Sequence, residues 1–99
     1  MIQFVWEFVA RKDCVHEFER HYSSAGDWAN LFQKSPGYRG TVLLRDAEQP
    51  NRYVTIDAWD GPELYQRMRN DFAEEFDRLD RACEAFTETE RRLGAFEVL

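Results

Sequence analysis

The chain has 99 residues, the length of one small domain, which excludes a two-domain organisation. Its 43% apolar and 15% aromatic residues can fill a packed core, which excludes a disordered chain. With 13 basic and 19 acidic residues the net charge is −6, and because an acidic protein repels phosphate backbones we expect no nucleic-acid partner. No apolar run is long enough for a membrane span or a secretory signal, so we expect no membrane contact and a cytoplasmic location. Cys14 and Cys83 show no CxxC spacing, which predicts two reduced thiols.

Residues 2–9 alternate as a β-strand does. One face carries Ile2, Phe4, Trp6 and Phe8, and the other carries Gln3, Val5, Glu7 and Val9. Both sets are largely apolar, so we expect both faces of this strand to be covered.

Two short helices are predicted next, the first capped by Asp13 and the second by Asp27. Their buried faces recur at spacings of three and four: Val15, Phe18 and Tyr22 in the first, and Trp28, Leu31 and Phe32 in the second. The turn at residues 35–37 stops the second helix.

Residues 38–45 and 52–59 predict two strands joined by a polar turn, and therefore a hairpin. On the second of these strands, Val54, Ile56 and Ala58 share one face, and Tyr53, Thr55, Asp57 and Trp59 share the other.

A long helical region follows, with a D-x-x-E capping box at Asp60 and Glu63. Its apolar stripe consists of Leu64, Tyr65, Met68, Phe72, Phe76, Leu79, Cys83 and Phe86. Asn70-Asp71 is a candidate kink or restart. We expect residues 87–90 to end the helix and residues 91–99 to form a fourth strand.

This order of elements is the β-α-β-β-α-β pattern of a ferredoxin-like α+β sandwich, in one domain over residues 1–99. Its helices cover one face of the sheet and leave the other open. We expect that open face to carry Val5, Val9, Tyr53 and Trp59. Apolar groups on an uncovered sheet face predict a partner surface, here a homodimer formed sheet to sheet.

Four segments carry a family resemblance: G-D-W-A-N-L-F at 26–32, S-P-G-Y-R-G-T at 35–41, R-Y-V-T-I-D-A-W at 52–59 and E-R-R-L-G at 90–94. With the first strand, they make the chain resemble the antibiotic biosynthesis monooxygenase-like (ABM) family of dimeric α/β barrels over essentially its whole length. The clearest marks are the S-P-G-Y turn and the I-D-x-W strand end. The resemblance implies a homodimer with facing sheets and a ligand cavity between each sheet and its helices. It also implies oxygen insertion into quinols or polyketide anthrones with no metal or flavin cofactor.

Haem degradation, the other activity that the resemblance implies, is not expected. Haem-degrading relatives use an Asn on the first strand and a Trp and a His on the long helical region. Residues 1–10 contain no Asn, and residues 60–87 contain neither Trp nor His. Met68 stands about where the helix Trp would be. A helix Trp is also implicated in the anthrone-oxidising branch, so this part of the catalytic pattern does not carry over.

Glu7 and His21 are the candidate catalytic bases. Glu7 lies mid-strand between aromatic residues, where a carboxylate must be paired, protonated or functional. It would take a proton from a phenol or enol, or form a salt bridge to an arginine on a neighbouring strand, which we favour. His21 can act as a general base because its ordinary pKa lies near neutrality, or it forms a solvated pair with Glu17. No third or fourth ligand accompanies Glu17 and His21, so we expect no metal site.

Asp57 poses the same question as Glu7, and an ion pair with Arg39 or Arg45, or at the dimer interface, is the stronger interpretation. The predicted ligand-binding residues are Tyr22, Trp28, Phe32, Tyr65, Met68 and Phe72. These side chains would form either the wall of a cavity for a flat aromatic ligand or a well-filled core. The hydroxyls of Tyr22 and Tyr65 could orient a substrate oxygen.

These observations predict a cofactor-independent monooxygenase acting on an electron-rich aromatic or quinol-like molecule. The alternative is a non-catalytic small-molecule-binding or structural dimer of the same fold. A proton-transfer enzyme such as an isomerase would also need only a cavity and a base.

Overall fold

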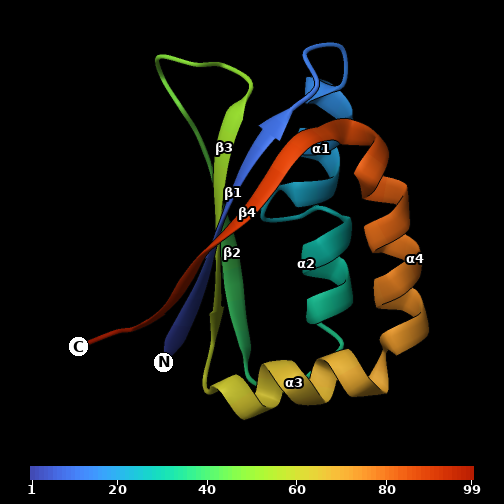
Figure 1. Cartoon of the computed structure of the whole chain (residues 1–99). Coiled ribbons are helices and arrows are strands. Elements are labelled where there is room, and N and C mark those ends of the chain that lie inside the picture. Colours follow the sequence, from blue (N-terminus) through green and yellow to red (C-terminus); the bar gives the residue numbers. More distant parts are fainter.

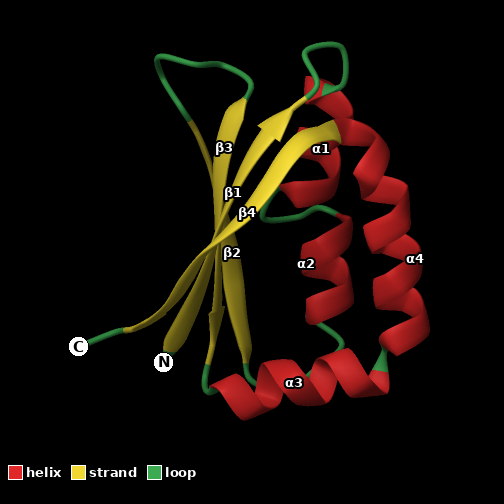
Figure 2. Cartoon of the chain, viewed as in Figure 1, coloured by secondary structure: helices red, strands yellow, loops and turns green.

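The computed structural model describes residues 1–99. Its strands are β1 (Ile2–Ala10), β2 (Tyr38–Arg45), β3 (Arg52–Trp59) and β4 (Thr87–Glu97). Its helices are α1 (Val15–Tyr22), α2 (Asp27–Phe32), α3 (Pro62–Asp71) and α4 (Ala73–Cys83), with a 3₁₀ turn at Glu84–Phe86. All the helices lie on one side of the sheet (Figures 1 and 2). The predicted ferredoxin-like α+β fold is confirmed.

The four strands run in the order β2-β3-β1-β4, and every neighbouring pair is antiparallel. In the register of β1 against β3, Ile2 lies opposite Trp59 and Phe8 lies opposite Tyr53. Opposite residues of an antiparallel pair point to the same face. The face of β1 that packs against the helices therefore continues through Tyr53, Thr55, Asp57 and Trp59 on β3.

This register contradicts one prediction. Tyr53 and Trp59 are only 1% and 0% exposed and lie in the core beneath the helices, not on the open face. Val54, Ile56 and Ala58 take the open face instead, beside Val5. The two largest side chains of β3 are in the core because burying an aromatic ring removes the most apolar surface from water.

The long helical region is interrupted, as the Asn70-Asp71 signal indicated. Phe72 leaves the helical backbone conformation, at φ −120° and ψ 34°, and separates α3 from α4. Other predicted boundaries shift. β4 begins already at Thr87, and the residues preceding α1, α2 and α3 are Cys14, Gly26 and Gly61, none with a side-chain capping bond. The predicted caps at Asp13, Asp27 and Asp60 are therefore wrong.

The face of the sheet away from the helices carries exposed apolar side chains. Val42, Leu44 and Phe96 are 51%, 48% and 52% exposed. Val42 lies opposite Ile56 in the register of β2 against β3, which places both on this face. This surface is the open face of the sheet. None of the helices combines the length and the apolar character that crossing a bilayer requires.

Candidate active site

A pocket of about 450 Å³ lies between the sheet and its helices. That volume is within the range of small-molecule sites. Four of its lining side chains are among the predicted ligand-binding residues: Tyr22, Trp28, Phe32 and Tyr65. Phe4, Trp6 and Phe8 from β1 and Phe76 from α4 complete the aromatic wall. Aromatic side chains therefore form much of the pocket wall.

The other two predicted ligand-binding residues do not line this pocket. Met68 is fully buried, at 0% exposed, in the core cluster. Phe72 packs against the edge of that cluster, with the Lys34 ammonium 5.7 Å from its ring centroid. An uninterrupted helix would have kept Met68, Phe72 and Phe76 in one stripe. Because the chain bends at Phe72, only Phe76 of these three reaches the pocket.

Asp57 supplies the pocket with a carboxylate from the sheet. The Thr41 hydroxyl donates a hydrogen bond to Asp57 Oδ1 at 2.6 Å, and both residues line the pocket. Burial raises the pKa of Asp57 to about 6, although the Thr41 bond acts in the opposite direction. The predicted ion pairs of Asp57 with Arg39 and Arg45 are absent, because Arg39 binds Asp60 and Arg45 lies against Glu19.

A carboxylate with this pKa can accept a proton near neutral pH. A general base works best when its pKa is close to the working pH, and an unperturbed Asp is too acidic. Asp57 also faces an aromatic wall, where its charge is poorly hydrated. Of the acidic residues that line the pocket, Asp57 and Glu90 come from the sheet, and Asp57 is the less exposed of the two.

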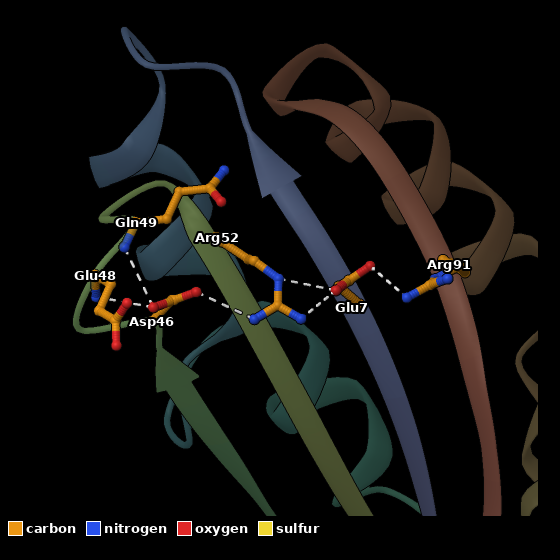
Figure 3. Close-up of polar contacts among 6 residues, drawn as sticks. All are labelled: Glu7, Asp46, Glu48, Gln49, Arg52 and Arg91. Atoms are coloured by element: carbon orange, nitrogen blue, oxygen red, sulfur yellow. Dashed lines mark hydrogen bonds and ion pairs between the residues drawn. The ribbon is translucent and has the colours of Figure 1, made fainter.

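Glu7 lies elsewhere. It sits on the open face, where Arg52 Nε donates to its Oε2 at 2.8 Å and Arg91 Nη2 lies 3.1 Å from its Oε1 (Figure 3). Arg52 also reaches Asp46, at 3.1 Å, so four charged groups form one network. The hydrogen bond from Arg52 lowers the pKa of Glu7, despite the opposing effect of desolvation. The prediction that Glu7 forms a salt bridge to an arginine on a neighbouring strand is therefore confirmed, and Glu7 does not line the pocket.

His21 is also outside the pocket. Its Nδ1 lies 2.7 Å from the backbone carbonyl oxygen of Glu17, and its Nε2 lies 3.2 Å from Asp27 Oδ2. The ring packs against Phe86 at 4.9 Å between centroids. The carbonyl contact replaces the predicted solvated pair with the Glu17 side chain. His21 is thus occupied in joining α1 to the start of α2.

Three further carboxylates line the pocket: Asp77 and Asp80 from α4, and Glu90 from β4. Asp77 and Glu90 are exposed, so these groups, here called the entrance carboxylates, lie where the pocket meets solvent. Partial desolvation by the surrounding pocket raises the pKa of Glu90, and the nearby charges of Asp80 and Glu84 add to that effect. The one cationic group is Arg69, whose guanidinium lies 3.9 Å from the centroid of the Phe76 ring.

Two pocket aromatics also carry polar groups. Burial raises the pKa of Tyr22, so its phenol stays neutral and keeps its proton. The indole N–H of Trp28 is buried without an acceptor. No three His, Cys, Asp or Glu side chains cluster closely enough to hold one metal ion.

No family model and no curated protein matches this sequence. Solved structures do match it. SnoaB, a cofactor-independent oxygenase from Streptomyces nogalater, superposes with a TM-score of 0.82 at 26% identity, covering 99% of this chain and 92% of SnoaB. A putative antibiotic biosynthesis monooxygenase from Bordetella bronchiseptica gives 0.76 at 20% identity, covering 99% and 96% of the two chains. A putative antibiotic biosynthesis monooxygenase from Deinococcus radiodurans superposes with a TM-score of 0.77 at 14% identity, covering 100% of this chain and 93% of the neighbour.

The neighbours from Bordetella and Deinococcus establish the shared fold over the full length of the chain. SnoaB adds a similarity in sequence over the same length. Together these structures confirm the resemblance to the ABM-like family and support a monooxygenase-like function.

Proposed function

We propose that this protein is a cofactor-independent monooxygenase acting on an electron-rich aromatic or quinol-like small molecule, with Asp57 as its base. One observation carries the proposal: a carboxylate with its pKa near 6 faces an aromatic pocket of about 450 Å³. Neither Glu7 nor His21 offers the pocket a base, so Asp57 takes the role that the sequence suggested for them.

In the proposed reaction, Asp57 takes a proton from an activated CH or phenolic OH of the substrate. The resulting anion is electron-rich enough to pass an electron to O₂, and a carbon–oxygen bond forms. For a CH₂ group that becomes a carbonyl, one oxygen atom of O₂ stays in the product. The other leaves as water with the two hydrogens that the carbon loses.

The aromatic wall would bind and orient the substrate. Phe4, Trp28 and Phe76 would pack against a flat ring system and exclude water, which strengthens the interaction between Asp57 and the substrate proton. The phenol hydroxyls of Tyr22 and Tyr65 could donate hydrogen bonds to the developing negative charge on a substrate oxygen.

Oxygen uptake tests this proposal. Metal-free, flavin-free protein would be mixed with 1,8-dihydroxyanthrone or a naphthoquinol in an oxygen electrode, with the uncatalysed oxidation subtracted. We expect uptake by the native chain and a loss of at least about 100-fold in Asp57→Asn, the usual scale of a general base. Glu7→Gln is the matched control, because it removes a carboxylate from the other face of the sheet. Equal uptake by native chain and Asp57→Asn would refute the assignment of the base.

We also propose that two copies pair through the open face. Its exposed apolar residues Val42, Leu44 and Phe96 support this, because monomers rarely expose a contiguous apolar sheet face. The same surface supports the alternative function, a binding or structural dimer without turnover. A ligand that binds saturably but is not oxidised would favour that alternative.

A further inference from the structure

Asp57 is the end of a chain of two hydrogen bonds. The hydroxyl oxygen of Tyr38 lies 2.5 Å from Thr41 Oγ1, and Thr41 in turn donates to Asp57 Oδ1 at 2.6 Å. A hydroxyl has one proton, and an ionised carboxylate can only accept. Since Thr41 gives its proton to Asp57, Tyr38 must be the donor to Thr41. While Asp57 is ionised, both hydrogen bonds are therefore donated in the direction of its carboxylate.

The backbone is shaped to make this chain. Tyr38 and Thr41 are three residues apart, so a regular strand would put them on opposite faces. A bulge in β2 changes that: Tyr38 lies opposite Trp59 and Gly40 lies opposite Ala58, which leaves Arg39 as the extra residue. Gly40 has φ +119°, a conformation that other residues rarely adopt. The bulge brings Tyr38 to the same face as Thr41.

Packing then fixes the phenol. The Tyr38 ring contacts Phe32 at 5.5 Å and Trp59 at 5.3 Å between centroids. Both neighbours are themselves buried. Thr41 lies directly opposite Asp57 in the register of β2 against β3 and is also buried. The Tyr38 phenol, which is the first donor of the hydrogen-bond chain, is therefore held rigidly, and Asp57 Oδ1 has a fixed partner in Thr41.

We infer that Thr41, oriented by Tyr38, is a positioning residue that fixes Oδ1 of Asp57 and presents Oδ2 to the substrate proton. The inference rests on the proposed function for the role of Asp57 as the base. The hydrogen bond to Oδ1 stabilises the ionised form, so it also limits how far burial raises the pKa of Asp57. Without it, a larger fraction of Asp57 would be protonated at neutral pH.

Burial and the Thr41 hydrogen bond are the two effects that shift the pKa of Asp57, although other titratable or charged groups share the pocket with it. The titratable or charged groups that line it are Tyr22 on α1, Tyr65 and Arg69 on α3, Asp77 and Asp80 on α4, and Glu90 on β4. The variants chosen below leave all six unchanged, so a change in the titration of Asp57 reports on the hydrogen-bond chain.

The test is a carbon-13 NMR titration of aspartate carboxyl groups, with Asp57→Asn used to assign the Asp57 resonance. We expect Thr41→Val to raise the titration midpoint of Asp57 by about one pH unit, the usual effect of one hydrogen bond to a charged group. Thr41→Ser keeps the hydroxyl and should titrate like the native chain. Tyr38→Phe removes only the far donor and should raise the midpoint by less.

The titration needs no substrate, so it separates the two proposals. A shifted midpoint in protein that consumes no oxygen would support the inference and count against the oxygenase. An unchanged midpoint in both Thr41→Val and Tyr38→Phe would overturn the inference, whatever the oxygen uptake. If Thr41→Val does not fold, Tyr38→Phe decides alone. In an active enzyme, the acid limb of the kcat/KM profile should move upward with the NMR midpoint.

Discussion

Glu7 and Asp57 lie on neighbouring strands of one sheet but on opposite faces. Glu7 is on the open face between Arg52 and Arg91, whereas Asp57 lines the pocket under the helices. Their pKa values move in opposite directions, because cationic partners lower that of Glu7 and burial raises that of Asp57. Two carboxylates separated in this way take different roles. The ion pairs of Glu7 tie neighbouring strands together, and proton transfer is the role that we propose for Asp57.

The pH dependence of turnover follows from the proposed base. Asp57 must be ionised to take a proton, so kcat/KM should rise as the pH increases through about 6 and level off above it. We expect Asp57→Asn to lack this limb. The profile would be measured by oxygen uptake with two substrates of different acidity. A limb that moves with the acidity of the substrate would contradict the assignment to Asp57.

The same raised pKa predicts how stability changes with pH. The folded state binds the Asp57 proton more tightly than the unfolded chain, so ionising Asp57 destabilises the fold. This penalty is absent below the ordinary pKa of 3.8, grows as the pH rises, and is complete above about 6. Asp57→Asn should therefore stabilise the fold at neutral pH, by at most about 3 kcal/mol. Urea titrations at pH 4 and pH 8 would measure the difference in unfolding free energy between Asp57→Asn and the native chain. We expect that difference to be much smaller at pH 4.

Much of this fold is predictable from the sequence, because strand and helix periodicities are local signals. The bounds 38–45 and 52–59 were predicted directly. The face of β3 that packs against the helices was not predicted correctly. Both faces are sufficiently apolar to be buried, one through Tyr53 and Trp59 and the other through Val54, Ile56 and Ala58. The sizes of Tyr53 and Trp59 are the signal that could have settled it.

That single error also hid the candidate base. Asp57 shares a face with Tyr53 and Trp59, so assigning those rings to the open face assigned Asp57 there too. The aromatic wall was easier to predict, because Trp28 and Phe32 follow helical spacing. The bulge that brings Tyr38 to Thr41 was not predictable from periodicity, since it depends on the conformation of Gly40.

Glu7 provides a stability prediction of the opposite sign. Its pKa is lowered on folding, so its ion pairs stabilise the fold above its ordinary pKa, and that contribution is lost as the pH falls through the lower, folded value. We expect Glu7→Gln to lower Tm by a few degrees at pH 7 and to flatten the acid side of the Tm curve. Glu88→Gln, on the exposed part of β4, is the control. A Tm change of equal size at pH 7 and pH 3 would contradict the ion-pair explanation.

The open face should be sensitive to a single charge. Val42 is half exposed there, and we expect Val42→Lys to convert a two-chain species into a one-chain species, because a lysine buried in an apolar interface is costly to desolvate. Ala82→Lys adds the same charge to an exposed position of α4 and should leave the mass unchanged. Sedimentation equilibrium over a range of concentrations measures both. A native chain that sediments as one copy at all concentrations would refute the dimer.

The entrance carboxylates should determine the charge of the ligand. With Asp57 they give the pocket lining four acidic groups against one guanidinium, that of Arg69. Like charges repel more strongly beside a low-dielectric wall, so an aromatic ligand carrying a carboxylate should bind about tenfold more weakly than its uncharged parent. The combined change of Asp80→Asn and Glu90→Gln should narrow that gap, whereas Glu63→Gln, outside the pocket, should not. Fluorescence titrations of the pocket tryptophans at two salt concentrations measure the affinities, and equal affinity of native protein for both ligands would contradict this prediction.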